Sequence, residues 1–170
     1  MMNLHKTPGE LVFFKILKLM ILLTASVLVI QTSYASSVTI TTLPTLPGGS
    51  HFCSAQGIND NKEIVGGSLD GSGNFHAVLW QSGKIKDLGT HRGYNNSIAL
   101  DINNNGQIVG YSNNASGNVH AVLWQNGMMT DLGTLPGSTY SGAYRINDCG
   151  AIVGECHNNN YTYPTLWTVT

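Results

Sequence analysis

Two histidines are the side chains of this chain best suited to bind a metal ion. His76 and His120 stand 44 residues apart in two similar segments. Equivalent positions in a ring of repeated units can converge on its axis, where imidazole nitrogens can hold a metal. The third equivalent position is Tyr163, which breaks a set of three histidines. We therefore predict no metal site and no cofactor, and expect each histidine to bond a neighbouring backbone group or the turn of the next unit.

The segment Asp101-Ile102-Asn103-Asn104-Asn105-Gly106 resembles the opening of a calcium-binding loop, in which alternate side-chain oxygens bind the ion. The resemblance ends there, because Ser112 stands where an EF-hand loop has its bidentate glutamate. Gly57 and Arg145 replace Asp101 at the equivalent positions. Because Asn and Gly also favour tight turns, the segment is predicted to be a hairpin turn and not a calcium site.

Carboxylates are frequent general acids and bases in catalysis, and this chain has few of them. Downstream of the N-terminal segment they are Asp60, Glu63, Asp70, Asp87, Asp101, Asp131, Asp148 and Glu155. Asp87 and Asp131 recur at equivalent positions, which favours the capping of a turn over a unique acid/base pair. The chain has no Gly-x-Ser-x-Gly elbow, HExxH helix or phosphate loop. We predict no catalytic residue.

The chain has three cysteines, Cys53, Cys149 and Cys156. In an exported protein the simplest outcome is one disulfide and one free thiol. The spacing leaves the pairing open, because it does not show which Cβ atoms can meet. Neither a CxxC cluster nor suitably spaced histidines accompany the cysteines, so a zinc site is not predicted.

Three tryptophans, Trp80, Trp124 and Trp167, recur with the same spacing to within one residue. Each follows a leucine, which fits an interior strand. Because aromatic side chains bury the most area per residue, we predict that they anchor one unit on the next. The alternative is a role in stacking against sugar rings.

The N-terminal 35 residues have the pattern of a secretory signal peptide. A 12-residue apolar run from Leu19 to Ile30 follows Lys15 and Lys18 and precedes Ser33-Tyr34-Ala35, a small-x-small cleavage pattern. We expect cleavage after Ala35 and a protein that is secreted or displayed at the cell surface, with the membrane contacted only through this segment. The alternative is an uncleaved membrane anchor, which the two lysines disfavour.

Charge excludes one class of partner. The chain has 170 residues, with 8 basic and 9 acidic side chains and a formal net charge of −1. Nucleic-acid binders usually carry a basic face or stripe, so we predict no nucleic-acid partner. Gly and Asn dominate the chain after the apolar N-terminus, which favours strands and turns over helices.

The rest of the chain repeats itself every 44 residues. Ile64-Val65-Gly66, Ile108-Val109-Gly110 and Ile152-Val153-Gly154 share this spacing. The middle unit predicts four strands, at residues 96–102, 107–112, 119–125 and 128–132, with Asn126-Gly127 as a two-residue primed turn. A period of about 40 to 45 residues with four strands is typical of propeller blades. We therefore predict an all-β fold of three four-stranded antiparallel repeats.

These repeats are predicted to form one domain over residues 36–170. Their approximate bounds are 45–89, 90–133 and 134–170. The third repeat lacks its last strand, and residues 37–44 resemble a fourth strand without a unit of its own. We predict that this segment closes the last repeat, as in propeller rings. Three units are few for a propeller, so the alternatives are a compact ring of three, an open array, or a homo-oligomer that completes a larger ring.

The repeat resembles the bacterial extracellular HAF repeat, which is named for a His-Ala-Phe tripeptide. The resemblance rests on Thr45-Leu46-Pro47-Gly48-Gly49-Ser50, Ala55-Gln56-Gly57-Ile58-Asn59-Asp60-Asn61, Ile64-Val65-Gly66, His76-Ala77-Val78-Leu79-Trp80 and Asp87-Leu88-Gly89-Thr90. It covers about residues 38–170. Val78 and Val122 replace the phenylalanine, and the third copy reads Tyr163-Pro164-Thr165. The resemblance implies an exported, surface-associated repeat protein of propeller-like fold, with no established reaction or ligand.

The sequence thus predicts a non-enzymatic binding module. Loops at 68–75, 112–118 and 155–162 differ among the copies, and variable loops on a repeated frame are where a binding surface is expected. The expected partner is an extracellular protein or a glycan. The alternatives are a small extracellular carbohydrate-active hydrolase or lyase with a central cleft, and a purely architectural module.

Overall fold

The computed structural model describes residues 37–49, 52–91, 94–114 and 116–169. The predicted signal peptide at residues 1–35 lies outside the described residues. The chain divides into two compact units, residues 1–41 and 42–170, and all strands of the described residues belong to the second unit. Within the described ranges no helix is long and apolar enough to cross a bilayer.

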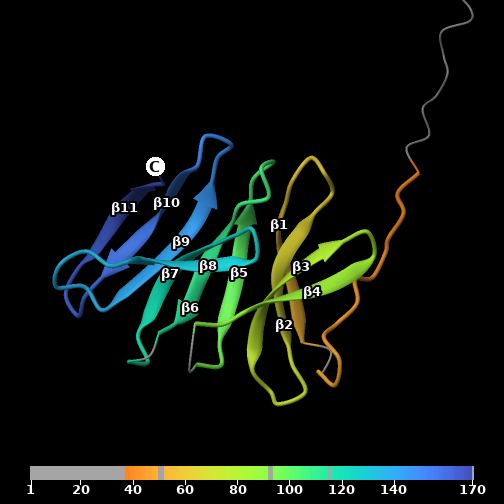
Figure 1. Cartoon of the computed structure of the whole chain (residues 1–170), viewed down its shortest axis with the longest axis horizontal. Coiled ribbons are helices and arrows are strands. Elements are labelled where there is room, and N and C mark those ends of the chain that lie inside the picture. Colours follow the sequence, from red (N-terminus) through yellow and green to blue (C-terminus); the bar gives the residue numbers. More distant parts are fainter. Residues whose placement is uncertain (1–36, 50–51, 92–93, 115, 170) are drawn as a thin grey trace, which may run out of the picture. The chain divides into compact units, whose positions relative to one another are not determined.

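The second unit is all-β, as predicted, with antiparallel strands in three sheets (Figure 1). The first sheet has the order β1 (Cys53–Ile58), β2 (Ile64–Leu69), β3 (Phe75–Gln81), β4 (Lys84–Gly89). The second has the order β5 (Ser97–Ile102), β6 (Ile108–Asn113), β7 (Val119–Gln125), β8 (Met128–Gly133). The third sheet has three strands, β9 (Tyr140–Ile146), β10 (Ala151–His157) and β11 (Thr162–Thr168), with β10 in the middle.

The strands predicted for the middle unit agree with β5 to β8 to within one residue at each end. The predicted primed turn is also confirmed, because Asn126 and Gly127 both have positive φ, at 54° and 75°. Ser82 and Gly83 form the corresponding turn of the first sheet, with φ of 51° and 75°. These two turns set the register between the third and fourth strands.

The layout of the strands is repeat-like. Ile64 pairs with Trp80, Ile108 with Trp124, and Ile152 with Trp167. In Figure 1 the hairpins β1–β2, β5–β6 and β9–β10 all lie at the upper end of the sheets, and the loops β2–β3, β6–β7 and β10–β11 all lie at the lower end. The three sheets form an open row, and no closed propeller is seen among the described residues.

The predicted closure of the last repeat by residues 37–44 is wrong for the single chain. These residues form no strand, and β11 is the edge of a three-stranded sheet. The segment that follows residue 42 lies instead on the first sheet, where Trp80 Nε1 donates to the Pro44 carbonyl oxygen at 2.7 Å. The backbone N–H of Leu46 donates to Ser68 Oγ at 3.2 Å. These contacts at the first sheet replace the predicted ones at the third.

Apolar side chains from neighbouring sheets form the core. Between the first and second sheets the cluster consists of Val65, Ala77, Ala99, Ile102, Ile108, Val122 and Trp124. Between the second and third sheets it consists of Val109, Ala121, Leu123, Ala143, Ile146 and Ile152. A third cluster packs Leu46 and Leu43 on the first sheet, around Val78 and Trp80. Trp124 therefore anchors the second sheet on the first, as predicted, and the partly buried Trp167 packs against the cluster between the second and third sheets. Trp80 is buried too, but it packs against Leu43 and Leu46 and not against another repeat.

One glycine in each sheet allows two strands to approach closely. A Cβ added at Gly66, Gly110 or Gly154 would lie 1.9 Å from a backbone carbonyl oxygen of the preceding strand. In the first two sheets this carbonyl precedes a β-bulge, at Ala55/Gly57 and at Ala99/Asp101. The bulge and the glycine therefore occur together, because only a residue without a side chain fits beneath the bulged strand.

Candidate functional site

The recurring histidines pair with the recurring aspartates of the neighbouring strand. His76 Nδ1 lies 2.7 Å from Asp87 Oδ2, and His120 Nδ1 lies 2.8 Å from Asp131 Oδ2. The expectation that each histidine bonds a backbone group or the next unit's turn is wrong, because the partner is a carboxylate of the same sheet. Sequence spacing did not reveal this pairing, since it depends on the register between the third and fourth strands.

The same carboxylates cap the end of the fourth strand, as predicted. Asp87 Oδ1 accepts from the Gly89 N–H at 2.7 Å, and Asp131 Oδ1 accepts from the Gly133 N–H at 2.7 Å. Both glycines have positive φ, and each follows an extra residue of the fourth strand, Leu88 or Leu132, that has no partner in the third strand. The histidine and the aspartate therefore stabilise a bulged edge, and each carboxylate oxygen has at least one hydrogen-bond partner within its own sheet.

The other nitrogen of each imidazole also faces a side chain of its own sheet. His76 Nε2 lies 3.8 Å from Asp70 Oδ2, and His120 Nε2 lies 3.0 Å from Asn114 Nδ2. Both ring nitrogens of His120 therefore lie within hydrogen-bond distance of a side chain, whereas His76 Nε2 is beyond that distance from Asp70. No group of three or more His, Cys, Asp or Glu side chains suited to a metal ion occurs in the described part of the chain.

Asparagines connect the three upper hairpins in a ladder. Asn59 Nδ2 donates to the Asn103 carbonyl oxygen at 3.1 Å, and Asn103 Nδ2 donates to the Asn147 carbonyl oxygen at 2.9 Å. Asn103 Oδ1 also accepts from the N–H groups of Asn105 and Gln107 within its own turn. The segment that resembles a calcium loop is therefore a hairpin whose oxygens bind backbone N–H groups, as the turn interpretation predicts. Asp101 Oδ2 accepts from the Ile146 N–H at 3.0 Å.

A second row of bonds runs beside this ladder. The Asn104 side-chain amide donates to Asp60 Oδ2 at 2.9 Å and to Asp148 Oδ2 at 3.0 Å. The Asn104 backbone N–H donates to Asp148 Oδ1. The bonds from the backbone and the side chain of Asn104 together lower the pKa of Asp148 below its usual value of 3.8. An amide between two carboxylates thus holds the three hairpins at a fixed spacing.

Acid is expected to weaken the contribution of Asp148. Because its folded pKa is lowered, its stabilising effect is present above the unfolded value of 3.8 and is lost as the pH falls through the folded pKa. Thermal unfolding of the protein and of Asp148→Asn is the measurement. The difference between their midpoints should shrink from about pH 5 to about pH 3. A constant difference over this range would contradict the role of the ionised carboxylate.

A crevice of about 260 Å³ opens between the first and second sheets. Its apolar wall is formed by Leu79 and Leu88 of the first sheet and by Ile108 and Trp124 of the second. The polar residues at its rim are Lys86, Asp87, Gln125 and Asn126. The crevice thus combines an apolar floor with a few convergent polar groups, which is typical of small-molecule sites.

Trp124 lines this crevice, and its indole has an unpaired donor. Its Nε1 is buried and has no hydrogen-bond partner among the described residues. The equivalent Trp80 is paired with the Pro44 carbonyl oxygen. A buried N–H without an acceptor costs about 1–3 kcal/mol.

Charge at the crevice favours an acceptor-rich ligand. Lys86 forms no ion pair with any residue of the described ranges. Asp87 lines the crevice, but its oxygens are bound to His76 and Gly89. The unengaged polar groups that line the crevice are the ammonium of Lys86 and the carboxamides of Gln125 and Asn126. This set binds carboxylates and hydroxyls.

The lower loops have a common backbone frame. Asp70, Asn114 and Asn158 each accept two backbone N–H groups through one side-chain oxygen. In the first loop, bonds to Asn74 and Ser72 lower the pKa of Asp70. The loops predicted as a binding surface are therefore small, capped turns of similar shape, and the structure brings none of them to the crevice residues.

The cysteines are unpaired. Cys53 and Cys149 are exposed, and Cys156 is buried in β10. The simplest expected outcome, one disulfide, is therefore not seen.

The crevice between the first and second sheets was not predicted from the sequence, because no motif marks it and it arises from the fit of two sheets.

Comparison of the chain with protein-family models, with curated proteins and with solved structures finds no match. The similarity to the HAF repeat accordingly stays a resemblance of motifs.

Proposed function

We propose that this protein is an exported, non-enzymatic binding module that holds an acidic glycan in the crevice between its first and second sheets. Export rests on the signal-peptide pattern of residues 1–35. The observation that carries the ligand class is the unpaired Lys86 beside the carboxamides of Gln125 and Asn126 at one apolar crevice. A sugar carboxylate would pair with the ammonium, and ring hydroxyls would bond the carboxamides.

The crevice supports binding better than hydrolysis. Glycosidases use two carboxyl groups on either side of the scissile bond. Asp87 is the single carboxylate among the described residues that line the crevice, and it already holds a histidine and a backbone N–H. A lyase or hydrolase remains the competing function, and the absence or presence of turnover separates the two.

Calorimetric titration with tetragalacturonate tests the proposal, with a neutral tetrasaccharide as the comparison ligand. We expect saturable binding of the acidic ligand alone. Lys86→Met should weaken it at least about tenfold, because a charge-assisted bond is lost. Lys84→Met removes the same charge from a position outside the crevice and should leave the affinity unchanged.

A carboxamide is tested separately. Gln125→Met keeps the length of the side chain, removes its polar group, and should weaken binding about three- to tenfold. Gln81→Met is the matched control, because Gln81 is the counterpart of Gln125 in the first sheet and does not line the crevice. Equal binding of the neutral sugar, or full affinity in Lys86→Met, would refute the assignment. Release of reducing ends that disappears in Asp87→Asn would establish an enzyme instead.

A further inference from the structure

The outer face of the third sheet carries exposed apolar side chains. Val153 and Leu166 pair across β10 and β11, and they are 48% and 63% exposed. Pro164, two residues before Leu166, lies on the same side of the sheet because strand side chains alternate. We call this side, defined by Val153, Pro164 and Leu166, the trailing face.

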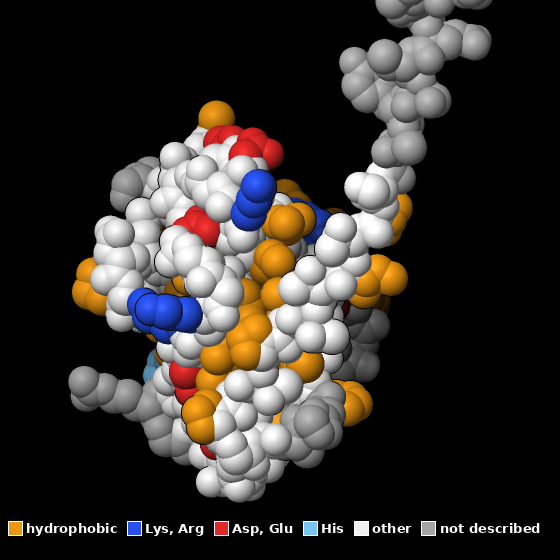
Figure 2. All heavy atoms as spheres, turned by 90° about the vertical axis from the view of Figure 1, so that its right-hand side faces the viewer, with side chains coloured by type: hydrophobic (Ala, Val, Ile, Leu, Met, Phe, Trp, Pro, Cys, Tyr) orange, Lys and Arg blue, Asp and Glu red, His pale blue; other side chains and the backbone are white. Residues whose placement is uncertain are grey.

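The outer face of the first sheet is apolar near β1. Ile58 is 63% exposed, and with Ala55 and Ile64 it lines a shallow hollow. Cys53 is exposed on the same strand. Figure 2 looks onto the end of the row where the first sheet lies, and it shows hydrophobic side chains gathered on that surface. We call the side defined by Cys53, Ala55 and Ile58 the leading face.

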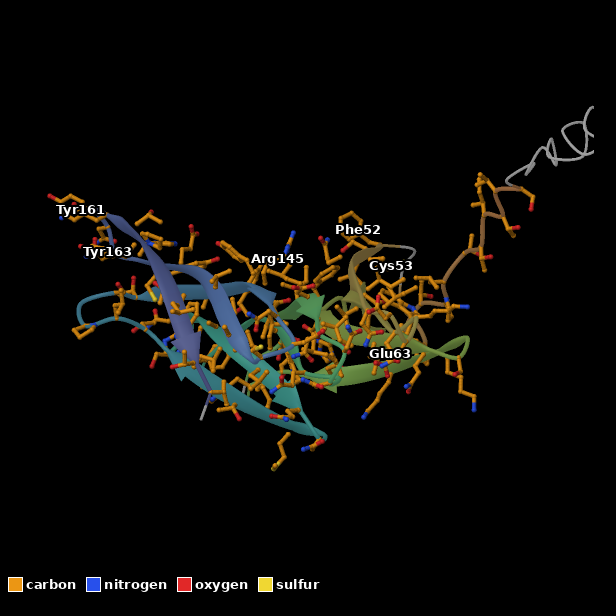
Figure 3. The ribbon with its side chains drawn as sticks, turned by 90° about the horizontal axis from the view of Figure 1, so that it is seen from above. Phe52, Cys53, Glu63, Arg145, Tyr161 and Tyr163 are labelled. Atoms are coloured by element: carbon orange, nitrogen blue, oxygen red, sulfur yellow. The ribbon has the colours of Figure 1, made fainter. Side chains whose placement is uncertain are left out.

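The same positions are buried where the sheets of the chain meet. Val109 is 0% exposed where Val153 is 48%, and Leu123 is 3% exposed where Leu166 is 63%. Ile102 and Ile146, the counterparts of Ile58, are 4% and 8% exposed. The chain makes the same interface twice, between its first and second sheets and between its second and third. The trailing face corresponds to one side of this interface, and the leading face corresponds to the other side. Figure 3 shows Cys53 of the first sheet and Tyr163 of the third well apart, so one chain does not join its own two halves.

The trailing face lacks the donor, and the leading face lacks the serine acceptor, of a hydrogen bond that both internal interfaces contain. Internally, the Ala77 N–H donates to Ser97 Oγ at 2.9 Å, and the Ala121 N–H donates to Ser141 Oγ at 2.8 Å. The trailing face has proline at this position, Pro164, which has no N–H. The leading face has cysteine in place of the serine, and cysteine behaves as a small apolar residue. Loss of donor and acceptor together is nearly neutral in energy, whereas loss of one is costly.

The asparagine ladder also has two matching open ends. The exposed Asn147 side-chain amide has no acceptor among the described residues, although its counterparts Asn59 and Asn103 each donate to the next hairpin. At the other end, the Asn59 carbonyl oxygen accepts from Lys62 N–H but, within the described part, from no ladder amide. The donor at the third sheet therefore fits the acceptor at the first.

The edge of the third sheet offers a place for one more strand. The Leu46 N–H donates to Ser68 Oγ of the first sheet. In the same way, the His91 N–H donates to Ser112 Oγ of the second sheet. Before His91 the chain forms β4, the fourth strand of the sheet that precedes the second one. By the same sequence spacing, residues 38–43 correspond to β4, and we expect them to form the fourth strand of a sheet that precedes the first. Their sequence, Val-Thr-Ile-Thr-Thr-Leu, suits an added edge strand.

We propose that copies of this chain associate head to tail, the trailing face of one copy packing on the leading face of the next. Residues 38–43 of the second copy then add to the β11 edge of the first. Because the two surfaces differ, the contact is heterologous and repeats until a ring closes or a filament grows. Two copies supply six sheets, which lies within the range of about four to eight for propellers.

Sedimentation of the exported protein, residues 36–170, and of matched variants is the test. At about 100 µM the protein should sediment as a dimer or a longer oligomer, and Leu166→Asp or Ile58→Asp should weaken association about a hundredfold because a charge is buried. Both side chains are exposed in the single chain, so unfolding midpoints should not change. Met128→Asp, at an exposed position outside both faces, is the control.

Mixing the two monomeric variants distinguishes head-to-tail contact from contact of like faces. Leu166→Asp retains its leading face, and Ile58→Asp retains its trailing face, so an equal mixture should form dimers although neither variant associates alone. Ile40→Pro should weaken association without altering either face, because proline interrupts the added strand. A monomeric wild-type protein, or a mixture that stays monomeric, would overturn the proposal.

A charge change should strengthen the contact. Inside the chain Asn104 stands between Asp60 and Asp148, but at the proposed junction Asp148 of one copy meets Asp60 of the next without an intervening amide. Asp60→Asn recreates the internal arrangement and should tighten association roughly five- to tenfold. Asp70→Asn makes the same charge change at the opposite end of the sheet and should have no effect. Weaker association in Asp60→Asn would contradict the proposed register.

Discussion

Gly110→Ala is expected to prevent the second sheet from folding. A Cβ at this position would lie 1.9 Å from the Ile98 carbonyl oxygen and 3.1 Å from Ala99 Cα. Both are backbone atoms, so no side-chain rotation relieves the clash, and β6 would have to separate from β5. We expect a loss of more than about 4 kcal/mol in the free energy of unfolding. Most of the protein would then be unfolded, because domains are stable by about 5–15 kcal/mol.

Gly127→Ala is the control for this substitution. Gly127 has a φ of 75° and no atom within 4 Å of an added Cβ, so alanine meets backbone strain but no clash. Its cost should be about 1 kcal/mol. Denaturant unfolding followed by circular dichroism measures both variants. If Gly110→Ala proves as stable as Gly127→Ala, the close approach of β5 and β6 is wrong.

Asn103→Ala should be the most damaging change at the upper hairpins. The side chain is buried, donates to Gln107 Oε1 and to the Asn147 carbonyl oxygen, and accepts two backbone N–H groups. Its removal leaves several of these groups without partners in a buried turn. We expect a loss of about 2–4 kcal/mol in the free energy of unfolding.

Asn147→Ala separates the ladder bond from the turn bonds. Asn147 makes the same two turn bonds, to the N–H groups of Cys149 and Ala151, but it is exposed and donates to no described residue. Its cost should be about 1 kcal/mol when measured in a monomeric background such as Leu166→Asp. Equal losses for the two variants would show that the inter-sheet bond contributes nothing.

Local signals in the sequence predicted the elements of the fold well. The spacing of 44 residues and the Asn126-Gly127 turn gave β5 to β8 to within one residue, because hairpin turns and alternating strands are determined locally. The burial of Trp80 and Trp124 followed from their position on interior strands.

Relations between distant segments were harder to predict. The position of Pro44 on the first sheet was missed, because a strand-like segment does not reveal which edge or face it will join. The pairing of His76 with Asp87 depends on a bulge that shifts the register by one residue. The crevice at Trp124 depends on the fit of two whole sheets, which no short motif encodes.

The ladder of Asn59, Asn103 and Asn147 has a consequence for how proteins of this kind change in length. Successive rungs are made by positions 44 residues apart, and each rung joins one sheet only to the next. Duplication of a whole 44-residue segment would thus insert a sheet together with its own rung and its own apolar junction. Deletion of one segment would remove all three at once. Gene duplication can therefore lengthen or shorten the row in whole steps without a redesign of the remaining core.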